Sequence, residues 1–350
     1  MKKRLFLESG LISLLSAENA IAQKTASDEE DEYILNFLRE NGLEKFYFFS
    51  SKNGEKLVEK FLGAGLYEDP AIGSVSKSIT GIAIAILIQE KKIALDSKID
   101  DFLVEFFGRK SINFDSSLKN LTIRRLLTHT AGLRPNYSTD PVNGINNYSV
   151  YKKFKKNPDQ ISYLIESDGY KSNGSNVHLY SNISYLLLSL VVESVSGVGF
   201  YDFCYKKIFD PLGIKSAKVY QEDIPLSGFS DWRISCSDLS KVWGNFVKND
   251  KEKLLTNKTI DELFLSNIGF ERDDGVRYTS GVYSKSSPDL SRYAIWHNGL
   301  YSFWPNSKTF LSYSSINSDG YFWCFSISNA PKSKELSNKI INYARSMAKK

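Results

Sequence analysis

Hydrophobic residues recur with two different spacings along the chain, one typical of β-strands and one typical of helices, and these spacings divide it into strand-like and helix-like segments. Near the start, strand-like runs at 46–49 and 56–62 flank Asn53 and Gly54. Asn-Gly between two such runs is the strongest short-range signal for a β-hairpin. A long apolar stretch at 74–91 follows, and its length predicts a buried helix rather than a strand.

Helical patterns fill the middle of the chain and strand patterns its end. From about 99 to 265, helix-like segments alternate with polar loops, including a turn-rich stretch at 134–147. A shorter helical pattern at 33–40 precedes the hairpin, and an amphipathic helix is expected at 334–347. Four aromatic-rich strand patterns span 277–283, 292–297, 309–314 and 320–328. This order predicts an α/β (α+β) fold, with one antiparallel sheet built from both termini, flanked by helices, and an all-helical inserted region.

Composition narrows the class of protein. A chain of 350 residues that is 42% hydrophobic can bury a sizeable core. Its net charge of +5 is spread along the chain, which favours a solvated basic face over a nucleic-acid-binding stripe. The three cysteines, Cys204, Cys236 and Cys324, lie far apart, so we expect neither a disulfide framework nor a zinc site. No later apolar run approaches the ~20 residues of an integral membrane span.

The first residues have the features of an export signal. A basic segment at 1–4 precedes a partly apolar run at 5–15, and Ala-Ile-Ala at 20–22 fits a cleavage site. We therefore predict a signal peptide at 1–22 and a periplasmic or otherwise exported protein. Because Glu8 interrupts the apolar run, a cytoplasmic protein with an amphipathic start is the alternative.

Ser74 and Lys77 form a Ser-x-x-Lys motif at the start of the predicted buried helix. Residues three apart share a helix face, and the helix N-terminus favours a developing anion. A lysine in an apolar setting holds its charge less strongly, so it can take the proton of the serine. The motif has low specificity by itself, because it also occurs at Ser116–Lys119, Ser149–Lys152 and Ser346–Lys349. Its context distinguishes Ser74, since Gly73 precedes it and the apolar helix follows.

A second candidate is Tyr180-Ser181-Asn182, the only Tyr-x-Asn of the chain, which precedes an apolar helix at 183–195. Beside a lysine cation a phenol loses its proton more readily, which makes Tyr180 a candidate general base. Asn182 could hydrogen-bond a substrate amide. The alternative is an ordinary helix cap, where Ser and Asn are favoured.

A third candidate is His297-Asn298-Gly299, at the end of a strand-like run. Glycine there lets another backbone or a substrate approach closely. The Leu300 and Ser74 amides could then form an oxyanion hole. The alternative is a strand end that runs into a turn. His129 and His178 are expected to be structural, and the three histidines are too widely spaced to suggest a metal site.

In this order and spacing, the three motifs resemble the serine β-lactamase-like family. That family includes class C β-lactamases, D-alanyl-D-alanine carboxypeptidases, related esterases and 6-aminohexanoate-oligomer hydrolases. Segment 123–133 is similar to its "LLTHTSGL" stretch, 210–214 to its "PLGM" turn and 235–239 to its "SxxDL" helix start. The resemblance runs from about residue 46 to the end of the chain.

The resemblance implies one β-lactamase-like domain at 30–350. Its α/β region would comprise about 33–98 and 270–350, its helical region about 99–265, with the active site between them. Ser74 would be acylated and Lys77 and Tyr180 would transfer protons, without a metal or cofactor. The Ser74 and Leu300 amides would hold the oxyanion. The substrate would contact Asn182, His297, Asn298 and Gly299.

The third motif departs from the Lys-Thr-Gly of the family's β-lactamases. Histidine is largely neutral near pH 7, so His297 grips a substrate carboxylate less reliably than lysine, and Asn298 replaces a threonine hydroxyl. We therefore predict a serine hydrolase of small-molecule or peptide substrates that cleaves an ester, amide or D-amino-acid peptide bond. A true β-lactamase or D,D-carboxypeptidase is the alternative. A non-catalytic ligand-binding protein on the same scaffold is the alternative of another class, although binding alone requires none of Ser74, Lys77 and Tyr180.

Overall fold

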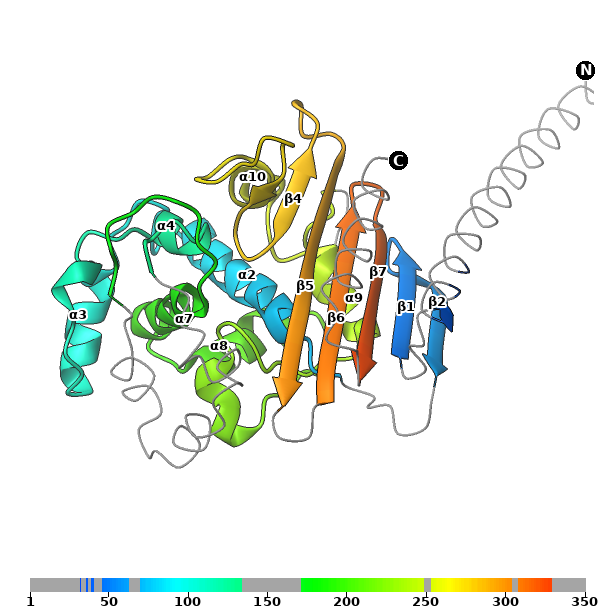
Figure 1. The fold of residues 1–350 in the computed structure, drawn as a ribbon, viewed down its shortest axis with the longest axis horizontal. Coiled ribbons are helices and arrows are strands. Elements are labelled where there is room, and N and C mark those ends of the chain that lie inside the picture. Colours follow the sequence, from blue (N-terminus) through cyan, green and yellow to red (C-terminus); the bar gives the residue numbers. More distant parts are fainter. Residues whose placement is uncertain are drawn as a thin grey trace, which may run out of the picture. The chain divides into compact units, whose positions relative to one another are not determined.

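Within the described residues, seven strands form one antiparallel sheet in the order β2-β1-β7-β6-β5-β4-β3 (Figure 1). Strand β1 pairs with β7, so the first strand lies beside the last. The sheet is therefore built from both ends of the chain, as predicted. The strands are β1 (Phe46–Lys52), β2 (Glu55–Leu62), β3 (Arg277–Tyr278), β4 (Tyr283–Ser286), β5 (Tyr293–Phe303), β6 (Lys308–Asn317) and β7 (Tyr321–Ser328).

The computed structural model describes residues 46–62, 70–133, 171–248, 253–303 and 308–328, and also residues 32, 36, 39 and 40. All elements considered below belong to the compact unit at 45–350, which is separate from residues 1–44. Several predicted features lie wholly or mostly outside the described residues. They are the signal peptide at 1–22, the helices at 33–40 and 334–347, and the loop at 134–147.

The predicted hairpin is present at the start of the sheet. Strands β1 and β2 are joined by Asn53 and Gly54, whose φ angles are 49° and 81°. Two central residues with positive φ make the type of turn whose twist matches that of paired strands. Asparagine and glycine adopt this conformation at low cost, which is why the dipeptide predicts the turn.

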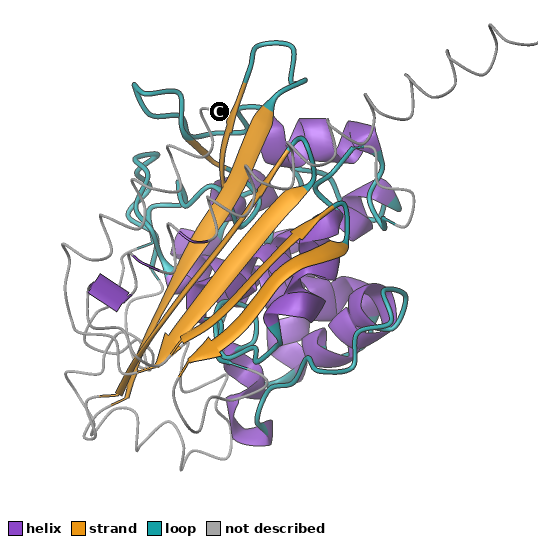
Figure 2. Cartoon of the chain, turned by 90° about the vertical axis from the view of Figure 1, so that its right-hand side faces the viewer, coloured by secondary structure: helices purple, strands orange, loops and turns teal. Residues whose placement is uncertain are grey.

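The described helices between β2 and β3 lie on one face of the sheet (Figure 2). This arrangement confirms the predicted fold class. The helices are α2 (Ser76–Gln89), α3 (Asp100–Arg109), α4 (Ile123–Leu127), α7 (Asn182–Ser196), α8 (Phe200–Cys204), α9 (Cys236–Gly244) and α10 (Asn257–Ile260). Shorter 3₁₀ or π turns are η1 (Gly73–Val75), η2 (Ser116–Leu118), η4 (Tyr205–Phe209), η5 (Gln221–Leu226) and η6 (Asp261–Leu265).

Helix α2 packs closely against the turn between β3 and β4. A Cβ on Gly81 would lie 1.9 Å from the carbonyl oxygen of Ser280, and a Cβ on Gly281 would lie 2.0 Å from that of Lys77. Only glycine fits at both contacts. The prediction of one strand at 277–283 was therefore wrong, because the chain turns at Gly281 (φ 79°) and forms two strands, β3 and β4.

Strand β5 continues beyond its predicted end at His297. It runs to Phe303, with Gly299 paired to Ser312 of β6. The alternative of a turn at Asn298-Gly299 was therefore wrong. A Cβ at Gly299 would lie 2.1 Å from the carbonyl oxygen of Ile72, so this glycine allows the backbone just before Ser74 to approach the sheet.

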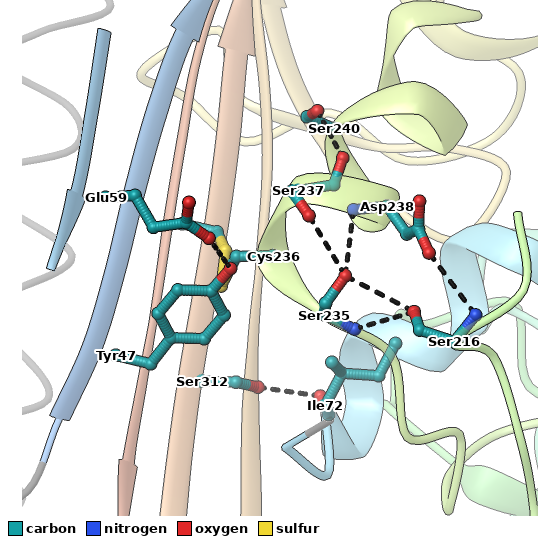
Figure 3. The surroundings of a disulfide bond; sticks show 11 residues. Tyr47, Glu59, Ile72, Ser216, Ser235, Cys236, Ser237, Asp238, Ser240 and Ser312 are labelled. Atoms are coloured by element: carbon teal, nitrogen blue, oxygen red, sulfur yellow. Dashed lines mark hydrogen bonds between the residues drawn. A yellow bond between two sulfur atoms is a disulfide. The ribbon is translucent and has the colours of Figure 1, made fainter. Parts of the chain in front are cut away.

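A disulfide joins Cys236, the first residue of α9, to Cys324 of β7 (Figure 3). The Cα atoms are 6.1 Å apart, although 88 residues separate the two positions in sequence. The expectation that the chain has no disulfide framework was wrong for this pair, since spacing in sequence does not reveal which cysteines the sheet brings together. Cys204 is free and buried.

Among the described helices, none is by itself long and apolar enough to cross a membrane. Helix α7 and the segment 200–209 reach that length and composition together, but only as a pair bent by 77°.

Candidate active site

Ser74 lies at the N-terminal end of the buried helix α2. It is the central residue of η1, which leads into α2 at Ser76. Every residue from 70 to 87 is buried except Ser74, which is partly exposed. The hydroxyl of this serine therefore lies where the apolar core meets solvent, beside a helix end whose dipole favours negative charge.

Lys77, one helical turn further on, has no exposed area. Its Nζ atom donates to Ser74 Oγ at 3.1 Å, Asn182 Oδ1 at 2.7 Å and the Phe229 carbonyl oxygen at 3.0 Å. An ammonium group has three N–H donors, so these three acceptors match it. Such hydrogen bonds offset the cost of burying the charge.

Tyr180 and Asn182 reach this lysine from the start of α7. Asn182 is the first residue of that helix, and its Oδ1 accepts from Lys77. The N-cap residue, Ser181, makes no side-chain capping bond. The ring centroid of Tyr180 lies 4.8 Å from Lys77 Nζ, a distance at which the ring face attracts a cation. The structure thus brings Ser74, Lys77, Tyr180 and Asn182 together.

His297 is buried, with 1% of its surface exposed. Its Nδ1 lies 2.7 Å from the Asn298 carbonyl oxygen, so Nδ1 carries the proton and donates. Its Nε2, 3.3 Å away, then accepts from the Tyr278 hydroxyl. Burial, and then the charge of Lys77, lower the pKa of His297 to about 3. The side chain is therefore a neutral imidazole with both nitrogens engaged.

Asn298, Gly299 and Leu300 follow His297 along β5, which packs against η1. The pairing of β4 with β5 ends at Trp296. Within the described residues, 297–303 therefore pair only with β6. One side of this part of β5 is an unpaired edge, and an extended substrate can add to such an edge.

All three histidines of the chain meet in one aromatic cluster beside Lys77. The His129 ring lies 4.3 Å from that of Tyr180 and 4.7 Å from that of Tyr278. His178 stacks on Phe270 at 3.8 Å, and its Nδ1 donates to the Thr128 carbonyl oxygen at 2.9 Å. Burial lowers the pKa of both His129 and His178.

Sequence reasoning missed two contributors to this site. Phe229 binds Lys77 through a main-chain carbonyl, for which no residue type is a signal. Tyr278, which holds His297, lies in the segment that was predicted as one continuous strand. Phe229 is 152 residues from Lys77 and Tyr278 is 19 residues from His297, so only the fold brings each to its partner. Among the described residues, no group of three or more His, Cys, Asp or Glu side chains is arranged to hold a metal ion.

Comparison with known proteins shows what this chain is similar to. A family model described as Beta-lactamase matches residues 70–232. The chain is 30% identical over 153 residues to penicillin-binding protein 4* of Bacillus subtilis, a match that covers 43% of this chain and 30% of the relative. It is 28% identical over 151 residues to teichoic acid D-alanine hydrolase of Staphylococcus aureus, covering 43% of this chain and 32% of the relative.

A solved structure extends the likeness beyond the matched segment. The octameric penicillin-binding protein homologue from Pyrococcus abyssi has a TM-score of 0.67 at 18% identity and covers 87% of this chain and 73% of that one. At this identity the likeness shows the fold alone. The chain spans about a third of the length of the curated relatives it matches. The predicted resemblance to the serine β-lactamase-like family is confirmed.

Proposed function

We propose that this chain is a serine hydrolase that forms an acyl-enzyme at Ser74 and cleaves an ester, amide or D-amino-acid peptide bond. The proposal rests mainly on the position of Ser74 beside Lys77. The single partly exposed side chain of 70–87, that of Ser74, lies 3.1 Å from the Nζ atom of a fully buried lysine. The names of the relatives support the reaction class, because they include a D-alanine hydrolase.

The contacts of Lys77 suggest how its charge is used. Held by three acceptors, the ammonium lies beside Ser74 Oγ and stabilises the oxygen as it loses its proton. Tyr180, as a phenolate stabilised by this cation, is the candidate proton acceptor, since its ring faces the same Nζ atom. Asn182 holds Lys77 and, in this proposal, also orients the substrate.

The reaction would then proceed in two halves. The proton of Ser74 passes to the Lys77–Tyr180 pair as Oγ attacks the carbonyl carbon. The resulting oxyanion accepts hydrogen bonds from the Ser74 and Leu300 amides. The pair returns the proton to the leaving alcohol or amine as the carbon–oxygen or carbon–nitrogen bond breaks. Water then attacks the acyl-enzyme, which releases the acid and regenerates Ser74.

The protonation state of His297 affects which substrates the site can bind. A neutral, buried imidazole whose two nitrogens bind Asn298 and Tyr278 offers no positive charge to a substrate carboxylate. We propose that Asn298 and Gly299 bind the substrate main chain along β5, and that substrates without a carboxylate beside the scissile bond are preferred. An ester or amide hydrolase is thus favoured over an efficient β-lactamase or D,D-carboxypeptidase.

A substrate panel tests this function. Purified protein is assayed with p-nitrophenyl esters, D-alanyl esters and peptides, and a cephalosporin. We expect turnover of esters or D-alanyl compounds, weak cephalosporin turnover, and loss of activity in Ser74→Ala. Ser116→Ala removes the exposed serine of another Ser-x-x-Lys sequence and should act as wild type. No turnover across the panel, or full activity in Ser74→Ala, would contradict the proposal.

We further propose that the mature protein is exported as one domain at 30–350, divided as the resemblance implies. The signal-like segment at 1–22 and the Cys236–Cys324 disulfide support export, because disulfides persist in oxidising compartments. N-terminal sequencing of protein isolated from its native cells tests this. A start at Gln23 is expected, whereas a start at Met1 with both cysteines reduced would indicate the cytoplasm.

A further inference from the structure

His129 contacts the ring of Tyr180 and the backbone of both neighbouring residues. The Leu179 N–H donates to the His129 carbonyl oxygen at 2.8 Å, and the Ser181 N–H donates to its Nδ1 at 3.2 Å. These two bonds fix the backbone immediately before and after Tyr180. The imidazole also packs on the phenol, with ring centroids 4.3 Å apart. One residue, 51 positions earlier in the chain, therefore fixes both the main chain and the ring of the tyrosine.

The bond to Ser181 determines the protonation state of the imidazole. A backbone N–H can only donate, so Nδ1 of His129 is the acceptor and the proton is on Nε2. If Nδ1 also carried a proton, its N–H would point at the backbone N–H of Ser181, and the hydrogen bond would be lost. His129 is 1% exposed, and its ring centroid lies 5.1 Å from that of Tyr185 and 4.7 Å from that of Tyr278. Burial, and then the charge of Lys77, lower the pKa of His129, which agrees with a neutral imidazole.

The conformation of His129 is itself unusual. Its φ of 55° is in the left-handed region, which costs a residue other than glycine about 1–3 kcal/mol. The turn after α4 holds this conformation, since the Thr130 N–H donates to the Arg125 carbonyl and Arg125 Nε donates to the Thr130 carbonyl. Such strain persists where neighbouring contacts enforce it, and it concentrates at functional sites.

We propose that His129 is a positioning residue that holds the Tyr180 phenol beside Lys77, through the Nδ1 bond to Ser181 and through ring packing. This role rests on the proposed function, in which Tyr180 moves the proton of Ser74. His129 does not contact the reacting atoms itself. Its effect is to limit the phenol to one place, since a displacement of ~1 Å in a reacting group can reduce the rate about 100-fold.

Two substitutions of nearly equal shape separate this role from general packing. His129→Asn keeps an acceptor close to the position of Nδ1, and asparagine tolerates a positive φ. His129→Leu has the same branching but no acceptor. With p-nitrophenyl butyrate as substrate, we expect kcat to fall about 100-fold in His129→Leu with little change in KM. His129→Asn should recover at least ~10-fold of that loss.

Val191→Ala is the control for a general loss of stability. Val191 is buried in helix α7, and its side chain makes no hydrogen bond to Tyr180 or Lys77. We expect it to lower Tm as much as His129→Leu while kcat stays near the wild-type value. Equal kcat in wild type and His129→Leu, or no recovery in His129→Asn at matched Tm, would overturn the positioning role while leaving Ser74 catalysis intact. A wild-type protein with the same turnover as Ser74→Ala would instead overturn the proposed function, and this role with it.

Discussion

At the scale of single residues, the candidate site depends on a buried charge that has its own partners. Lys77 is the one buried lysine among the described residues, and it donates to oxygens from three separate parts of the chain. Removing it takes away a cation beside Ser74 and leaves the Asn182 and Phe229 oxygens without this donor. Replacing Lys77 should therefore lower both the activity and the stability of the protein.

Lys77→Met is the substitution that separates the two effects. Methionine is apolar and of similar length, which suits this buried position, so we expect the protein to fold with a loss of about 1–3 kcal/mol from the oxygens that lose a donor. The acylation rate should fall at least ~1,000-fold, as expected when a proton-transfer group is lost. Stopped-flow acylation and urea unfolding measure the two quantities. An acylation rate within tenfold of wild type would show that the lysine is structural only.

His297 predicts a pH dependence of stability. Its pKa is about 3 when folded and near the ordinary 6.5 when unfolded, so the unfolded chain binds a proton between these values that the folded chain does not. Stability therefore decreases as pH falls from about 6.5 towards 3, by up to about 1.4 kcal/mol per pH unit for one such group. His297→Gln does not titrate and should lose stability less steeply in this range.

Urea unfolding at a series of pH values checks this, and the slopes are compared because the substitution also changes stability at neutral pH. His129 and His178 still titrate in the variant, and their pKa values are lowered too. In the variant, the free energy of unfolding should therefore depend less steeply on pH than in wild type, but the dependence should not disappear. Parallel slopes in wild type and variant would mean that His297 is not buried as a neutral group.

At the scale of elements, glycines determine how closely α2 approaches the sheet. Gly81 and Gly281 face backbone atoms of the opposing segment at distances that no side chain allows. In contrast, a Cβ on Gly108 of α3 would have nothing within 4 Å. Gly81 and Gly108 both lie in helices, so the same substitution by alanine can be compared at a crowded and at an open position.

Gly81→Ala and Gly108→Ala should change stability in opposite directions. Overpacking against Ser280 is expected to cost Gly81→Ala about 1–3 kcal/mol or more. It should also lower activity, because α2 carries Lys77. Alanine at Gly108 should stabilise α3 by up to about 1 kcal/mol. Thermal unfolding of both variants is the measurement, and a stabilised Gly81→Ala protein would show that the helix does not pack as described.

The disulfide links an element of the inserted region to the sheet. A cross-link between positions 88 residues apart should stabilise the fold by about 2–4 kcal/mol. Reduction should lower the Tm of wild type and leave that of Cys236→Ser unchanged. Cys204→Ala is the control, since it keeps the bridge and should keep the response to reduction. A Tm that does not respond to reductant would show that the bridge is absent in solution.

At the scale of the whole molecule, the sequence predicts local features better than contacts between distant segments. The hairpin at Asn53-Gly54, the helix after Ser74 and the helix after Asn182 were predicted because each has its signal within a few residues. The partners of Lys77 and His297 were only partly predictable, since Phe229 contributes a carbonyl and Tyr278 follows a misassigned strand. The Cys236–Cys324 pair was missed for the same physical reason, because the packing of helix α9 against strand β7 brings it together.

The proposed function depends on acylation of Ser74, which peptide mapping by mass spectrometry can detect. Wild type, Ser74→Ala and Ser116→Ala are incubated with a fluorescent penicillin or an activated D-alanyl ester, quenched in acid and digested. We expect an acyl adduct on the peptide that contains Ser74 in wild type and Ser116→Ala, and no adduct in Ser74→Ala. An adduct on another residue, or equal labelling of Ser74→Ala, would contradict it.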